Sequence, residues 1–224
     1  MTSKFSLQEK SLWIIDGVNY KNRIAQISLS QKLLPSRTQD EHAEQRKKAK
    51  SNEFYLESMP FYHTLFTTLY DHKEDKDFKN GVEEARQFIK ESMFKTWLLA
   101  LTRPIYNPVN KKDLIIHDYK QPKESRIRLD SIIGPDSYIL DENAKNVKKP
   151  LQALLGTRQS LQEINNIYKW LVDGDLYLFR VNETPKKSLE TVAGFDAISV
   201  RAGLGCGWGP TYSDTGLGVR REKI

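Results

Sequence analysis

The C-terminal stretch from Thr191 to Ile224 constrains the fold of this chain more than any other segment. From position 203 to position 209 a glycine stands at every second position, and the residues between them are Leu204, Cys206 and Trp208. Because side chains alternate between the two faces of a strand, this pattern predicts a strand with glycine along one face. Each glycine in a strand costs about 0.5–1 kcal/mol relative to alanine, so the row needs a structural or functional reason.

Three explanations for the glycine row can be compared on the sequence. A phosphate-binding glycine loop is excluded by spacing, because Trp208 stands three positions after Gly205 and G-x-G-x-x-G is therefore absent. The second explanation is a tight, irregular loop in which glycine supplies positive φ. The third is that the glycines occupy exposed surface positions that can hold any residue. The sequence leaves the second and third explanations open.

Short motifs on both sides of the glycine row form a recognisable series. They are Gly194-Phe195-Asp196-Ala197, Arg201-Ala202, Pro210 and Gly218-Val219-Arg220. Together they resemble the C-terminus of the formylglycine-generating-enzyme type of C-type lectin fold. The stretch differs from that family in that Ala197 directly follows Asp196 and Ala202 directly follows Arg201. More specifically, it resembles the variable proteins of diversity-generating retroelements, which include those of archaeal viruses and the phage tropism determinants.

In those proteins a reverse transcriptase copies a template repeat and substitutes its adenines, so that selected codons scatter into a restricted set of residues. The resemblance implies a diversified, ligand-binding surface within about residues 195–220. The ligand-binding residues that it implies are Ile198, Val200, Gly203, Gly205, Gly207, Trp208, Gly209, Thr211, Tyr212, Thr215 and Gly216. The fixed scaffold that it implies is Phe195, Ala197, Ser199, Arg201, Ala202, Leu204, Cys206, Pro210, Leu217 and Gly218. The expected partner is a protein on a cell surface, and the expected place of display is a virion or a cell.

The composition is that of a highly charged chain. It has 35 Lys and Arg against 29 Asp and Glu in 224 residues, a net charge of +6. Because acidic residues are scattered among the lysines and arginines, we interpret the charged side chains as a solvated surface. We therefore do not favour nucleic acid as the partner. A nucleic-acid-associated protein that uses the clusters Arg46–Lys50 and Lys145–Lys149 is the first alternative. No apolar run is long enough to span a membrane and no secretory signal is visible, so we expect no membrane insertion.

The sequence predicts recognition without catalysis, and no metal or cofactor. The single cysteine, Cys206, is expected to be a buried thiol, whereas the formylglycine-generating relatives need a pair of cysteines for copper-dependent oxidation. The histidines are scattered, with no H-x-x-x-H pair, and G-x-S-x-G is absent. Trp208 is followed by Gly209-Pro210, not by the Asn-Asp found beside calcium in some C-type lectins, so no calcium site is expected. A degenerate enzyme of the formylglycine-generating type is the second alternative.

Hydrophobic periodicity predicts an α+β fold with short antiparallel strands and two to three helices. Helices are expected over 54–70, over 80–97 with Asn80 as the N-cap, and from the Ser160–Glu163 capping box to Asp173-Gly174. Strands are expected over 12–15, 113–117, 127–133 and 176–181. The polar segment 36–52 is expected to be a mobile loop or an exposed helix.

The resemblance refines the α+β class to a C-type lectin-like fold. It also suggests a division of the chain. We expect an N-terminal segment, residues 1–52, that packs on or extends a lectin-like domain at residues 53–224.

Overall fold

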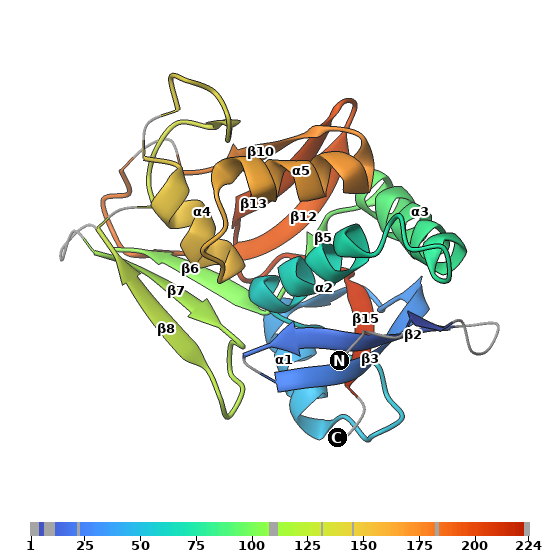
Figure 1. Cartoon of the computed structure of the whole chain (residues 1–224). Coiled ribbons are helices and arrows are strands. Elements are labelled where there is room, and N and C mark those ends of the chain that lie inside the picture. The colour runs from blue at the N-terminus through green and yellow to red at the C-terminus, as the bar shows by residue number, and fades with distance from the viewer. Residues whose placement is uncertain are drawn as a thin grey trace.

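The computed structural model describes residues 5–6, 12–21, 23–107, 112–130, 132–144, 146–181 and 184–221. These residues form an α+β fold of five helices and several small sheets (Figure 1), so the predicted fold class is confirmed at that level. The helices are α1 (Gln39–Lys48), α2 (Met59–Asp71), α3 (Lys79–Lys95), α4 (Lys148–Leu155) and α5 (Leu161–Val172).

The strands are short except near the chain ends. They are β1 (Phe5–Ser6), β2 (Leu12–Tyr20), β3 (Arg23–Leu33), β4 (Arg37–Thr38), β5 (Leu98–Leu99), β6 (Thr102–Tyr106), β7 (Asp113–His117), β8 (Ser125–Leu129), β9 (Ser137–Tyr138), β10 (Asp175–Phe179), β11 (Leu189–Glu190), β12 (Val192–Ile198), β13 (Arg201–Trp208), β14 (Ser213–Asp214) and β15 (Leu217–Arg221). Three sheets have the orders β1-β2-β3-β15, β5-β12-β13-β10-β9 and β11-β6-β7-β8, and β14 pairs with β4. Neighbouring strands are antiparallel, except that β10 and β13 are parallel.

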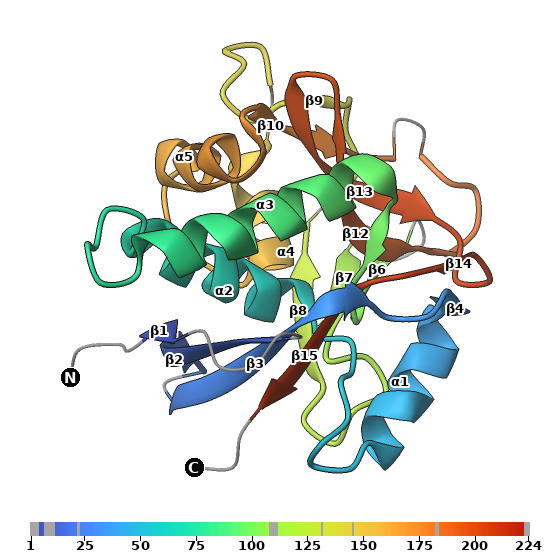
Figure 2. The same ribbon diagram turned by 90° about the vertical axis from the view of Figure 1, so that its right-hand side faces the viewer.

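The first and last parts of the chain share one sheet. β15 pairs with β3, with Leu217 opposite Leu33 and Arg221 opposite Ile27, and Figure 2 shows β15 beside β3. Trp13 of β2 lies in the same hydrophobic core cluster as residues of the helices and of β12 and β13. The predicted N-terminal segment 1–52 therefore contributes strands, a helix and core side chains to the same packed unit as the rest of the chain.

An aromatic cluster joins the five-stranded sheet to the helices. The ring of Phe195 on β12 lies 5.9 Å from that of Tyr62, 5.4 Å from that of Phe66 and 6.4 Å from that of Tyr168. Tyr62 and Phe66 belong to α2, and Tyr168 belongs to α5. Because side chains alternate along a strand, the face that carries Phe195 is the core face of this sheet, and the opposite face is called the outer face below.

Local sequence signals located some of the elements. The capping box is confirmed, because Ser160 Oγ accepts from Glu163 N at 3.2 Å and Glu163 Oε2 accepts from Ser160 N at 2.7 Å. The prediction of Asn80 as an N-cap is wrong, since α3 begins at Lys79 and its N-cap is Phe78. Helix α4 was not predicted.

The polar segment 36–52 forms α1, which is docked on the protein by a polar side chain. Gln39 is fully buried, and its Nε2 donates to the carbonyl oxygens of Ala100 at 2.7 Å and Thr102 at 3.0 Å. A second capping box starts this helix, between Thr38 and Glu41. The segment is thus a helix with a buried polar contact, which a hydrophobic pattern does not reveal.

A buried ion-pair cluster connects the ends of the chain with α1. The carboxylate of Glu57 is fully buried, 2.9 Å from Arg46 Nη2 and 2.6 Å from Arg221 Nη2. Arg46 Nη1 also lies 2.9 Å from Asp118 Oδ1, and Lys21 Nζ lies 2.6 Å from Asp118 Oδ2. Burial by itself would raise the pKa of the Asp118 carboxyl, but the charges of Arg46 and Lys21 outweigh it and hold that pKa below its usual value. The cluster therefore fixes β15 and α1 relative to each other.

We expect Glu57→Gln to lower the free energy of unfolding by about 3 kcal/mol, because it takes the carboxylate away from Arg221 and leaves the buried Arg46 with Asp118 as its remaining carboxylate partner. Urea unfolding measures this change. The matched control is Glu44→Gln, which breaks an exposed pair with Lys47 and should cost at most about 0.5 kcal/mol. Equal losses in the two variants would show that the cluster contributes no more than a surface pair.

His63 and His117 are two of the three buried histidines in the described residues, and both are held in the neutral form. His63 on α2 has Nε2 2.7 Å from Gln159 Oε1. His117 on β7 has Nδ1 3.0 Å from Thr102 Oγ1 and Nε2 2.8 Å from the carbonyl oxygen of Ala153. Burial lowers the pKa of His63 and of His117 to about 4. Both side chains are therefore packed in the interior of the protein.

Stability should fall as the pH is lowered from 6.5 to 4. In that range the unfolded chain, with a histidine pKa of about 6.5, takes up protons that the folded protein does not, so each buried histidine costs about 2 kcal/mol at pH 5. Urea unfolding at pH 7, 6 and 5 measures the loss, and His63→Gln should make the pH dependence clearly shallower. An unchanged slope in that variant would contradict the assignment.

Candidate functional site

The predicted recognition residues lie on and around the antiparallel pair of β12 and β13. Ala202, Leu204 and Cys206 of β13 are buried, and they alternate with the glycines. Gly203 stands opposite Asp196 of β12 and opposite Tyr177 of β10. The glycines therefore form the floor of the outer face, between side chains of the two neighbouring strands.

Side chains from neighbouring segments lie directly over two of these glycines. A Cβ atom on Gly203 would overlap Asp196 Oδ1 and would lie 3.2 Å from Phe179 Cε2. A Cβ atom on Gly205 would lie 3.1 Å from Trp97 Nε1. A side chain at Gly203 would have to displace the carboxylate of Asp196, and one at Gly205 would press on the ring of Trp97, so these two glycines let neighbouring side chains cover the backbone.

The structure corrects both explanations that the sequence left open. Among the described residues the glycines with positive φ are Gly17 and Gly156, so the row does not serve a left-handed turn. The expectation that the row is a free surface is right for Gly207 and Gly209, where an added Cβ would meet nothing within 4 Å.

That expectation is wrong for Gly203, Gly205 and Gly216, which are buried. At Gly216 a Cβ atom would overlap Leu56 Cδ1 and lie 3.1 Å from the carbonyl oxygen of Leu99. Thr215 is half-buried, and its backbone N–H donates to Asp214 Oδ1 at 2.8 Å. These four positions are therefore structural, because neighbouring side chains or hydrogen bonds fill the space around them.

The other seven predicted positions are exposed. They are Ile198, Val200, Gly207, Trp208, Gly209, Thr211 and Tyr212. Val200, in the turn between β12 and β13, is 73% exposed. Since a strand rises about 3.3 Å per residue, this turn and Trp208 lie roughly 20 Å apart at opposite ends of β13.

An aromatic stack forms the end of the outer face near Trp208. The pairing of β12 with β13 shifts between Val192 and Gly194, and such a bulge turns the following side chain to the other face. The ring of Trp208 lies 5.5 Å from that of Trp97 and 4.4 Å from that of Tyr212. The buried ring of Trp97 thus supports the exposed ring of Trp208, on which the ring of Tyr212 stacks.

Between the two ends lie aromatic residues that the sequence did not indicate. The guanidinium carbon of Arg201 lies 4.6 Å from the ring centroid of Tyr177 and 4.9 Å from that of Phe179. Tyr138 of β9 packs edge-on against Tyr177, with centroids 5.0 Å apart. These rings come from β9 and β10, distant in sequence, so only the sheet pairing reveals them.

The recognition face is defined here as the outer face with both its ends. Its residues are Trp97, Tyr138, Tyr177, Phe179, Asp196, Ile198, Val200, Arg201, Gly207, Trp208, Gly209, Thr211 and Tyr212. Five of the nine exposed large hydrophobic side chains in the described residues belong to it: Tyr138, Ile198, Val200, Trp208 and Tyr212. Exposed apolar side chains gathered in this way mark binding surfaces. Within the face, burial raises the pKa of the Asp196 carboxyl, and Arg201 opposes the shift.

Other predicted chemistry can be placed as well. Cys206 is a buried thiol, as expected, and burial raises its pKa to about 12, so it is held as the unreactive thiol form. Arg46, from the first basic cluster, is engaged in the ion-pair cluster, and Lys145, from the second, lies outside the described residues. In the part of the chain that the structure describes, no group of three or more His, Cys, Asp and Glu side chains is placed to hold a metal ion. No helix there is long and apolar enough to cross a membrane.

Comparison with protein-family models, with curated protein sequences and with solved structures gives no match.

Gly203→Ala should lower the free energy of unfolding by about 1–3 kcal/mol, because the new methyl group must displace Asp196 from its place beside Arg201. Gly207→Ala is the matched control on the same strand and should change it by less than about 1 kcal/mol, with a gain as the favoured sign. Urea unfolding of both variants measures the difference. Equal stability of the two variants would contradict the packing described for Gly203.

Proposed function

We propose that this protein is a recognition protein that binds a protein ligand through the recognition face and catalyses no reaction. The observation that carries the proposal is the gathering of exposed aromatic and apolar side chains on one rigid sheet face. Trp208 and Tyr212 are the main anchors, since Trp, Tyr and Arg dominate the energetics of protein interfaces. Each ring is held by its neighbour, so little conformational entropy is lost when a partner covers it.

The chemistry of the face indicates what it binds. The guanidinium of Arg201 lies against two aromatic rings, and its charge acts on the carboxyl of Asp196. Apolar side chains stand at both ends of the face. A surface that is mainly aromatic and apolar and carries few charges suits another protein surface better than the phosphate backbone of nucleic acid, whose binding requires several exposed basic side chains.

We further propose that the protein is a variable protein of a diversity-generating retroelement with a C-type lectin-like fold, and that its ligand is on a cell surface. The motifs around the glycine row support this proposal, as do the helix pair α2 and α3 and the short strands around them. The buried glycines of β13, which side chains of neighbouring segments cover, lie between the seven exposed positions and the core. Side chains can vary at such positions without changing the packing below.

The proposed mode of binding is multivalent. A standard interface uses about 20–30 residues on each side, which is more than the recognition face offers. One copy therefore binds weakly, and several copies displayed together bind tightly through their high effective concentration.

A display library that randomises the seven exposed positions should contain mostly folded clones, because none of these side chains supports the core. A matched library that randomises Gly203, Gly205, Thr215 and Gly216 should contain few, since each of these positions is packed. Surface display level and protease resistance measure folding. Selection of the first library against lysozyme, as an arbitrary protein target, should return binders. Failure to fold, or failure to return any binder, would overturn the recognition proposal.

The retroelement proposal has its own test in the DNA. We expect a near-copy of the segment that encodes residues 195–220 close to the gene, differing almost only where the copy has adenine. The differences should fall in codons of the seven exposed positions. Absence of such a copy would remove the retroelement proposal and leave the recognition proposal standing.

A further inference from the structure

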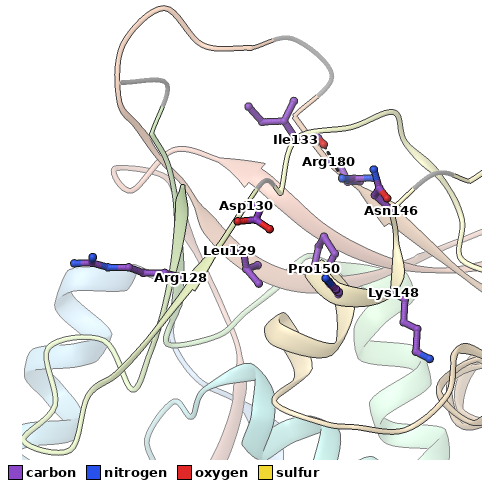
Figure 3. Close-up of a pocket in the computed structure, with 9 residues that line it drawn as sticks. Arg128, Leu129, Asp130, Ile133, Asn146, Lys148, Pro150 and Arg180 are labelled. Atoms are coloured by element: carbon purple, nitrogen blue, oxygen red, sulfur yellow. Dashed lines mark hydrogen bonds between the residues drawn. The ribbon is translucent and has the colours of Figure 1, made fainter. Parts of the chain in front are cut away.

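A cavity of about 650 Å³ shares no residue with the recognition face. It opens where the end of β8, the start of α4 and the end of β10 meet, as Figure 3 shows. Its lining residues are Arg128, Leu129, Asp130, Ile133, Asn146, Lys148, Lys149, Pro150 and Arg180. The volume is within the range of about 300–1,000 Å³ that is usual for small-molecule sites.

One cation of the cavity is fixed in position. Arg180 is 7% exposed, and its Nη2 donates to the carbonyl oxygen of Ile133 at 2.6 Å and its Nε to that of Ile132 at 3.3 Å. The guanidinium of Arg180 occupies the space beside Gly134, where a Cβ atom on residue 134 would overlap it. The loop with these carbonyls is held in turn by Asp113, whose Oδ2 accepts from Ile132 N at 2.6 Å. The guanidinium of Arg180 is therefore held in a fixed position at the wall of the cavity.

The cavity has a strongly positive lining. Among the described residues that line it, four side chains are cationic, those of Arg128, Lys148, Lys149 and Arg180, and one is a carboxylate, that of Asp130. Figure 3 shows the long side chains of Arg128 and Lys148 projecting from opposite parts of the rim. Both are exposed and flexible, so their charges raise the potential at the opening and can turn toward a bound anion.

The remaining lining is apolar with one amide. Leu129, Ile133 and Pro150 give the cavity a hydrophobic surface, and Asn146 stands beside Arg180 in Figure 3. Apolar walls with a few convergent polar groups are typical of sites that hold a ring or hydrocarbon body and orient it by one charged group.

We infer that this cavity binds a small molecule that joins an anionic group, phosphate or carboxylate, to a ring or apolar body. The anionic group lies between Arg180 and the side chains of Lys148 and Lys149. The body lies on Leu129, Ile133 and Pro150. This site is additional to the recognition face and does not depend on its role.

Adenosine 5′-monophosphate and adenosine are matched probes, because they differ only in the phosphate. Calorimetry at low ionic strength should show that the monophosphate binds at least about tenfold more tightly than adenosine, since the cationic lining attracts only the phosphate. It should also bind more tightly than inorganic phosphate, which lacks a body to cover the apolar wall. Benzoate against benzamide repeats the comparison for a carboxylate.

Variants locate the site. Lys148→Gln with Lys149→Gln should weaken monophosphate binding by roughly tenfold. Lys47→Gln with Lys48→Gln removes the same charge from α1 and should leave binding within about twofold. Asp130→Asn should strengthen binding severalfold, because it removes the one anionic side chain of the lining. Trp208→Ala should leave it unchanged, which separates this site from the recognition face.

Three outcomes would overturn the inference. The first is equal binding of adenosine and its monophosphate, or no binding of either. The second is equal loss in the two double-lysine variants, which would show attraction to the net positive charge of the whole protein instead of binding in the cavity. The third is a lower monophosphate affinity after Asp130→Asn, which would show that this carboxylate favours the bound molecule instead of opposing its charge. Circular dichroism of each variant confirms that the fold is kept.

Discussion

The contact on which the rest of the structure depends is the fully buried carboxylate of Glu57 between Arg46 and Arg221. A buried carboxylate is stable only with its partners in place, so α1 and the last strand are held in one arrangement. Arg221 ends β15, which lies beside β3 in the N-terminal sheet. The terminal stretch is therefore attached at two places. Strands β12 and β13 hold its first part in the five-stranded sheet, and β15 holds its last part in the N-terminal sheet.

This double attachment explains how a strand rich in glycine can support a rigid surface. Glycine usually weakens a strand because it adds backbone freedom and no packing. Here Trp97, Asp196 and Phe179 supply the packing from neighbouring segments, so the space above Gly203 and Gly205 is filled by side chains that come from elsewhere. The packed glycine segment of β13 is therefore held in place, and it positions the exposed rings of the recognition face.

Elements with local signals could be predicted from the sequence, and those that depend on distant partners could not. The capping box of α5 and the apolar stripe of α2 are encoded within a few residues, so their prediction needs no tertiary structure. The outer face differs, because Tyr138 and Tyr177 reach it only through the pairing of β9 with β10 and of β10 with β13. Gly203 could not be told from Gly207 either, since the difference lies in Asp196 across the strand pair. Helix α1 was ambiguous because a buried glutamine docks it.

The recognition face and the cavity meet at the end of β10, where Phe179 belongs to one and Arg180 to the other. The two residues are adjacent, yet the alternation of a strand directs them to different surroundings. Arg180 is held by backbone carbonyls of residues 132 and 133, which do not change with side-chain identity. The proposed variation on the recognition face would therefore leave the cavity intact, so the two proposals, a changeable protein-binding surface and a constant small-molecule site, are compatible in one chain.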